Sequence, residues 1–179
     1  MHFSSIFTYF RRELPHSSDA NRIVLTLSIC SHRAIKGLLL AASSWEGSMQ
    51  AFKDRVGLVT GSTGEGLGRS IAFTLAREGA KVVVNYGTGH PNNSHAADKV
   101  LKEIRTLGGK GYAFKADTRE EDEVQSMIDG IVTLYGRLDY LICNAGGAWE
   151  AKDITEIEQE HWRSVIKAEV DGLVYETGS

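Results

Sequence analysis

The chain has 179 residues, with 20 lysines and arginines against 23 aspartates and glutamates, and a formal net charge of −3. This length suffices for one domain with a sizeable core, and the charge lacks the basic excess typical of nucleic-acid binding. Cys30 and Cys143 form no metal or redox motif, and no apolar run approaches the roughly 20 residues of a membrane span. We therefore expect no metal, nucleic acid or membrane partner, and a cytoplasmic location.

Residues 1–48 differ in composition from the rest of the chain. Serines are frequent there, and bases outnumber acids: Arg11, Arg12, Arg22, Arg33 and Lys36 against Glu13, Asp19 and Glu46. A basic, serine-rich, acid-poor leader is typical of a transit peptide, so an organelle is the alternative location. We expect residues 1–48 to be an extension outside the fold and residues 49–179 to form the domain.

Strand and helix signals alternate from residue 55 onward. The predicted strands are 55–60, 81–86, 110–117 and 138–147, and the predicted helices are 69–80, 94–109, 119–136 and 156–176. Apolar strands separated by helices indicate an α/β fold with a Rossmann-like, doubly wound parallel sheet. In the last helix we expect a core face made of Trp162, Val165, Ile166 and Val170.

The segment VGLVTGSTGEGLGRS places Gly61, Gly64, Gly66 and Gly68 between the first strand and the first helix. Glycines allow a ligand to approach the backbone closely, and a helix N-terminus favours a pyrophosphate. The spacing G-x-G-x-G is neither the strict G-x-G-x-x-G fingerprint nor a P-loop. It is also compatible with a Rossmann-type methyltransferase, so the turn by itself leaves both enzyme classes open.

The other strand ends favour a dinucleotide, because the carboxyl ends of parallel strands meet at one edge of the sheet. Asn85 closes the second strand where an acid would bind ribose hydroxyls. Arg69 follows Gly68 as a source of positive charge for a 2′-phosphate. We therefore predict NADP in preference to NAD, and a methyltransferase is disfavoured.

Four segments in this order resemble the short-chain dehydrogenase/reductase family: VTGSTGEGLGRSIA, VVVNY, KADTREEDEV and GRLDYLICNAGG. The resemblance covers about residues 51–176. Thr60 and three of the glycines match the family's T-G-x-x-x-G-x-G motif, with one extra residue between Gly61 and Gly66. Asp117 matches the acid that holds the adenine amino group, and residues 144–146 match the N-A-G element that lines the cofactor cleft.

The strand ends and the resemblance together give one set of predicted cofactor-binding residues. They are Gly61, Ser62, Thr63, Gly66, Leu67, Gly68, Arg69, Asn85, Tyr86, Asp117, Thr118, Asn144, Ala145 and Gly146. His90 and His95 lie in the loop after the second strand without a set of acids or cysteines around them, so we predict no metal ligands there.

No catalytic residue is predicted. The family's proton donor is the tyrosine of a Y-x-x-x-K motif, and none of the six tyrosines has a lysine four residues later. The family also uses an asparagine in the helix after the fourth strand, in the context W…N-x-x-G. Trp162 and Gly172 match this context, but Glu169 occupies the asparagine position.

The resemblance thus implies the N-terminal cofactor-binding part of a family member, truncated before the catalytic motif, with the sheet incomplete at its C-terminal side. We then expect the fourth strand to be an exposed edge and the isolated chain to aggregate or fold only partly. The implied function is an NAD(P)-dependent oxidoreductase acting on a small carbonyl or alcohol substrate, a homo-oligomer at full length. A non-catalytic nucleotide-binding module is the alternative.

Overall fold

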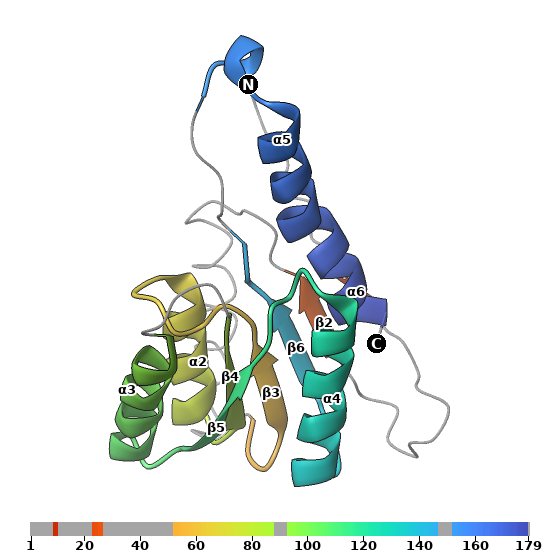
Figure 1. Ribbon diagram of the computed structural model, residues 1–179. Coiled ribbons are helices and arrows are strands. Elements are labelled where there is room, and N and C mark those ends of the chain that lie inside the picture. The colour runs from red at the N-terminus through yellow and green to blue at the C-terminus, as the bar shows by residue number, and fades with distance from the viewer. Residues whose placement is uncertain (1–8, 11–22, 27–51, 88–92, 147–151, 179) are drawn as a thin grey trace.

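The computed structural model describes residues 9–10, 23–26, 52–87, 93–146 and 152–178 (Figure 1). The strands are β1 (Tyr9–Phe10), β2 (Ile23–Thr26), β3 (Val56–Val59), β4 (Lys81–Tyr86), β5 (Lys110–Lys115) and β6 (Tyr140–Cys143). The helical segments are α2 (Leu67–Arg77), α3 (Asn93–Thr106), α4 (Glu121–Tyr135), η1 (Ile154–Glu156), α5 (Gln159–Ile166), η2 (Lys167–Asp171) and α6 (Gly172–Gly178). Within these ranges, no helix combines the length and apolar character needed to cross a membrane.

The strands form one sheet in the order β1-β2-β6-β3-β4-β5. Strands β2, β6, β3, β4 and β5 run parallel to one another, and β1 pairs antiparallel with β2. The chain moves outward from β3 to β4 and β5, and then returns to the other side of β3 to add β6. The predicted doubly wound Rossmann-like fold is therefore confirmed, and its switch point lies between β3 and β6.

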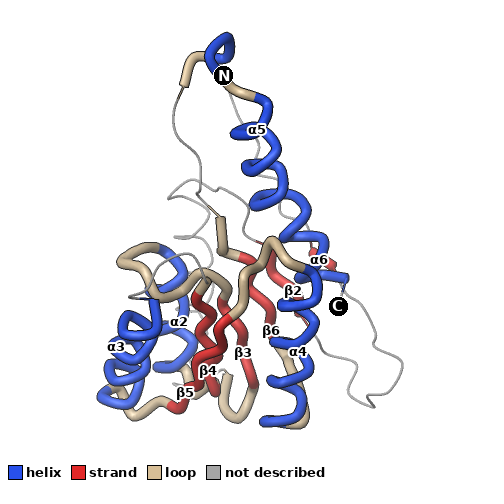
Figure 2. Tube along the Cα trace, viewed as in Figure 1, coloured by secondary structure: helices blue, strands red, loops and turns tan. Residues whose placement is uncertain are grey.

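Helices cover both faces of the sheet (Figure 2). Strand residues alternate between the faces, so each strand supplies both apolar cores. One core joins α2 and α3 to Val59, Val82, Val84 and Ile142. The other joins α4 and α6 to Val56, Leu58, Val83, Leu141 and Cys143. This two-sided burial explains why the strands read as nearly continuous apolar runs.

The last helix faces the core with a different set of residues from the predicted one. Trp162 and Val170 are 54% and 48% exposed, so their placement in the core face was wrong. The buried positions are Ala168, Gly172 and Glu176, which are four residues apart and share one side of the helix. Gly172 allows the helix to approach closely here, because a Cβ atom on it would lie 2.9 Å from the backbone oxygen of Thr118.

The edge of β6 also differs from the expectation. Strand β2 pairs with it in parallel, from Ile23 beside Tyr140 to Thr26 beside Cys143, so the prediction of an exposed edge was wrong. The physical reason is that β6 offers a row of unpaired backbone groups, and the apolar run IVLT suits a strand position. This strand lies inside residues 1–48, which the sequence analysis places outside the fold. Apart from β1 and β2, that segment lies outside the described residues, so the domain boundary stays a prediction.

Candidate cofactor-binding site

The glycine turn packs directly against the loop that follows β6. Gly61 has a φ of +58°, and a Cβ atom there would lie 2.8 Å from the Cα atom of Ala145. A Cβ atom on Gly68 would overlap the side-chain amide of Asn144. Only glycine at these two positions lets the turn and the loop meet this closely.

The other two glycines face open space. A Cβ atom on Gly64 or Gly66 would meet no atom within 4 Å, so the protein itself does not need glycine there for packing. Helix α2 begins directly after Gly66, which provides no side-chain cap for the first N–H groups. Room beside the backbone and uncapped N–H groups at a helix start suit the pyrophosphate of a dinucleotide. The residues present therefore fit the cofactor that the sequence predicts.

Thr60 joins the glycine turn to the N-A-G loop. Its buried Oγ1 accepts hydrogen bonds from the backbone N–H groups of Asn144 at 2.9 Å and Ala145 at 3.0 Å. In return, Nδ2 of Asn144 donates to the backbone oxygens of Thr60 at 2.9 Å and Gly61 at 3.2 Å. The carboxyl ends of β3 and β6 thus form one hydrogen-bonded unit.

Asn85 holds the other side of the turn. Its Oδ1 accepts from the N–H of Gly61 at 3.1 Å, and its Nδ2 donates to the carbonyl of Ala116 at 3.0 Å. Ser62 is also buried, and its hydroxyl donates to the carbonyl of Val59 at 2.7 Å. Both side chains are used inside the protein, a positioning role that the sequence analysis missed.

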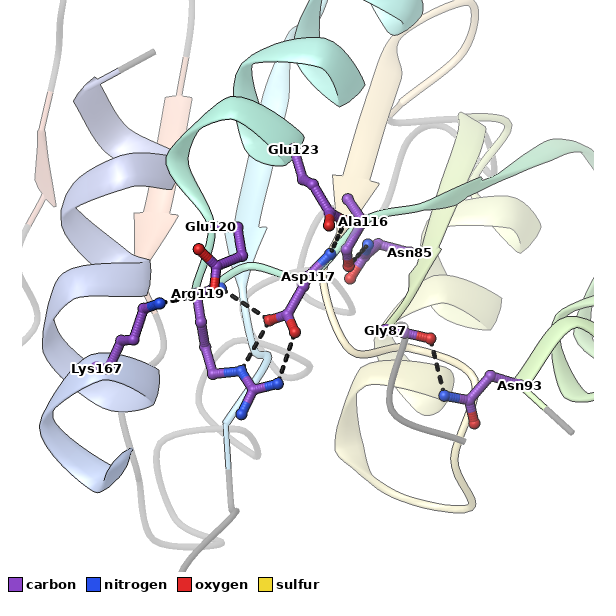
Figure 3. A network of polar contacts seen from close by, with 9 residues as sticks. All are labelled: Asn85, Gly87, Asn93, Ala116, Asp117, Arg119, Glu120, Glu123 and Lys167. Carbon is purple, nitrogen blue, oxygen red and sulfur yellow. Dashed lines mark hydrogen bonds and ion pairs between the residues drawn. The ribbon is translucent and has the colours of Figure 1, made fainter. Parts of the chain in front are cut away.

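Strand β4 ends at Tyr86, as the predicted range 81–86 has it, so Asn85 is the second-last residue of the strand rather than the one that closes it. Side chains alternate along a strand, and Asn85 points into the protein while Tyr86 is half-buried. Beyond the strand, Nδ2 of Asn93 donates to the carbonyl of Gly87 at 2.9 Å (Figure 3). Neither Asn85 nor Tyr86 is an acid, so the feature that favours NADP is present at both positions.

Arg69 forms an ion pair with α3. Its Nη2 lies 2.6 and 2.7 Å from the two carboxylate oxygens of Glu103, and its guanidinium lies over the ring of Phe73, 5.3 Å from the centroid. The Arg69 side chain is only 16% exposed. The structure therefore shows this arginine bound to a protein carboxylate, and its binding of a 2′-phosphate stays a prediction.

Asp117 lies at the carboxyl end of β5 and is held by Arg119. The carboxylate accepts from Nε of Arg119 at 2.9 Å and from Nη2 at 2.6 Å, and hydrogen bonds to Asp117 raise the pKa of Arg119 (Figure 3). The N–H of Asp117 donates to Glu123 at 2.8 Å. Thr118 beside it is buried. A ligand amino group at Asp117 would share the carboxylate with Arg119.

Glu176 is a buried acid that the sequence analysis missed. Its side chain is 4% exposed, and its Oε2 accepts from the Thr60 hydroxyl at 3.1 Å. Burial raises the pKa of Glu176 to about 7, against hydrogen bonds from Cys143 and Thr60 that lower it. Nothing in the sequence signals this position, because an acid near the end of a helix is usually exposed.

The remaining predicted residues lie around this unit. Thr63 is half-buried, Leu67 packs against the core beneath α2 and α3, and Gly146 has a φ of +152°. In the described ranges, no three histidine, cysteine, aspartate or glutamate side chains are grouped as a metal site would require. His95 is among the described residues, and His90 lies outside them.

This arrangement defines a class: an α/β protein with a doubly wound parallel sheet whose edge at the switch point suits a dinucleotide. The family follows from comparison. Residues 55–178 match the family model of the short chain dehydrogenases, so the chain belongs to that family, whose members are NAD(P)-dependent dehydrogenases and reductases. This membership sets aside the methyltransferase alternative.

Individual relatives agree with this result. The chain is 37% identical over 124 residues to cyclohexanol dehydrogenase of an Acinetobacter species, covering 69% of this chain and 47% of the relative. It is 36% identical over 116 residues to a 3-oxoacyl-[acyl-carrier-protein] reductase of Staphylococcus aureus, covering 65% and 45%. A dehydrogenase/reductase structure from Sinorhizobium meliloti matches with a TM-score of 0.67 at 27% identity, over 73% of this chain and 50% of that one. The chain spans about half the length of the curated relatives it matches.

Proposed function

We propose that this chain is the cofactor-binding part of an NAD(P)-dependent oxidoreductase that transfers hydride between a nicotinamide cofactor and a small carbonyl or alcohol substrate. The observation that carries the proposal is the unit formed by Thr60, the glycine turn and the N-A-G loop at one end of the sheet. Gly64 and Gly66 leave room beside it, at the uncapped start of α2.

The protein's part in this function is to hold the cofactor in one orientation. Backbone N–H groups between Gly61 and Gly68 bind the pyrophosphate, Asp117 and Thr118 bind the adenine, and residues 144–146 line the other half of the cleft. Ser62 and Asn85 keep the turn in shape through their buried hydrogen bonds. When bound, the cofactor supplies or accepts the hydride.

NADP is the preferred cofactor in this proposal. Asn85 and Tyr86 place no carboxylate at the end of β4, so no protein anion repels a 2′-phosphate there. For Arg69 to bind that phosphate, it has to exchange Glu103 for the ligand. The preference therefore rests on the missing acid first and on Arg69 second. The full-length protein is proposed to act as a homo-oligomer in the cytoplasm.

A non-catalytic nucleotide-binding module is the second candidate. One observation favours it: Glu169 stands where the family has its asparagine. Both candidates use the same cofactor site. Turnover by the full-length protein distinguishes them, because only the enzyme oxidises NADPH when a ketone is added.

Titration of the full chain with NADPH and NADH, followed by cofactor fluorescence, tests the site. We expect saturable binding that is tighter for NADPH and at least about tenfold weaker in Gly66→Val, because the new side chain fills the room kept for the pyrophosphate. Gly178→Val is the matched control, since this position also has open space but lies at the end of α6. Equal binding by wild type and Gly66→Val would refute the proposed site.

A further inference from the structure

A carboxylate lies against the N-A-G loop. A Cβ atom built on Gly146 would be 2.7 Å from Oε1 and 2.9 Å from Oε2 of Glu169, so this side chain rests directly on the glycine. Glu169 belongs to η2, a π-helical turn between α5 and α6. Such turns are rare, and they are frequent at functional sites because they redirect a side chain from the regular helix.

Three contacts fix the position of this turn. Nζ of Lys167 lies 2.6 Å from Oε1 of Glu120 at the start of α4 (Figure 3). Gly172 fits against the carbonyl of Thr118, and Glu176 accepts a hydrogen bond from Thr60. The helix is thereby attached to the ends of β3 and β5 as well as to α4, and Glu169 is held over the end of β6.

The end of β6 is where the proposed function places the nicotinamide half of the cofactor. In a doubly wound sheet the two nucleotide halves lie on opposite sides of the switch point. Asp117, just after β5, marks the adenine side, so the nicotinamide half lies toward residues 144–146. Its ring carries a positive charge when oxidised and none when reduced, so a nearby carboxylate interacts differently with the two forms.

We propose that Glu169 is a specificity-determining residue for the redox state of the cofactor: its carboxylate strengthens binding of the oxidised form relative to the reduced form. The inference rests on the proposed function. Asparagine, the residue that the family places at this position, carries no charge and provides no such bias. The same site in this chain therefore discriminates between the two forms more strongly.

The test measures dissociation constants of NADP⁺ and NADPH for the full chain by calorimetry, at one pH and one ionic strength. In Glu169→Gln and Glu169→Asn we expect the ratio of the NADP⁺ constant to the NADPH constant to rise at least about threefold. Glu169→Asp keeps the charge and should stay close to wild type. Glu160→Gln, an exposed acid on α5, is the matched control.

Binding of both forms with a ratio unchanged in Glu169→Gln and Glu169→Asn overturns the inference and leaves the proposed function standing. An equal rise in Glu169→Asp also overturns it, because side-chain shape rather than charge is then responsible. If wild type binds neither form, the proposed function fails, and the inference fails with it. Melting temperatures of all variants, measured without cofactor, show which of them are folded.

Discussion

The strand order of the sheet has two sides, one running from β3 to β5 and the other from β6 to β2, and the two are built differently. On one side, β3, β4 and β5 follow one another in sequence and are connected by α2 and α3, so each element packs against its neighbours along the chain. On the other side, β6 lies between β3 and β2, and its face is covered by α4 together with α6, a helix from the end of the chain. The first side depends on local connections, and the second on contacts between distant segments.

Asp139 illustrates the distant contacts. It lies just before β6 and accepts hydrogen bonds from the N–H of Val56 at 2.8 Å and from Arg55 at 3.1 Å, both at the start of β3. Burial raises the pKa of Asp139, but hydrogen bonds from Arg137, Val56 and Arg55 outweigh this and lower it overall. The carboxylate of Asp139 therefore connects the amino ends of β3 and β6, and Thr60 connects their carboxyl ends. The position of β6 therefore depends on a few individual side chains, such as Asp139 and Thr60, that connect it to β3.

Removal of residues 1–48 should have the largest effect, because it takes β2 away from β6. The backbone groups of Tyr140–Cys143 on that edge then lack their strand partner and pair with other chains. We expect the full chain to elute as a monomer in size-exclusion chromatography with light scattering, and the shortened chain to form larger species. A variant without residues 1–8 keeps β1 and β2 and is the control. A shortened chain that stays monomeric with an unchanged melting temperature would show that β2 contributes nothing.

Glu176 should make stability depend on pH. With a pKa of about 7 in the folded chain and an ordinary value of 4.5, the folded state retains a proton that the unfolded state has lost. The free energy of unfolding therefore falls as pH rises from about 4.5 to 7 and is level above that. Between pH 5 and 8 we expect a loss of roughly 2–3 kcal/mol that is absent in Glu176→Gln.

Urea unfolding of both proteins across this pH range measures the difference. Glu160→Gln is again the exposed control, and it should follow wild type. If wild type and Glu176→Gln lose stability in parallel, the buried carboxyl is not the group that titrates.

Gly172→Ala should have the smallest effect of the three. The added methyl group would lie 2.9 Å from the Thr118 carbonyl, so the helix has to move away from the end of β5. Overpacking costs about 1–3 kcal/mol, and the gain in helix propensity offsets about 1 kcal/mol of it. Gly178→Ala, which meets nothing within 4 Å in the same helix, should be neutral or stabilising.

Thermal melts of the two alanine variants side by side give the comparison directly. Both sites lie in the same helix, and only Gly172 is packed against another segment. The difference between the two melting temperatures therefore measures the packing of Gly172 on Thr118. Equal melting temperatures would mean that this contact does not hold the two sides of the sheet together.

Much of the fold could be predicted from the sequence because its signals are local. Apolar runs, helical periodicity and glycine positions identified the strands β3, β4, β5 and β6, and the order of the motifs identified the family. The N-A-G loop and the glycine turn were predicted to converge, and Thr60 joins them. These features follow from short stretches whose backbone requirements are written in the residues themselves.

Only the tertiary structure decided which partners the polar side chains of the candidate site have. Asn85 and Ser62 form buried hydrogen bonds within the protein. Arg69 pairs with Glu103, and the carboxylate of Glu169 lies against Gly146. The tertiary structure also decided which face of the last helix is buried, and that β2 is the strand that pairs with β6. Each of these depends on residues far apart in the chain, and the free energy of such contacts is set by packing and desolvation, which no local pattern records.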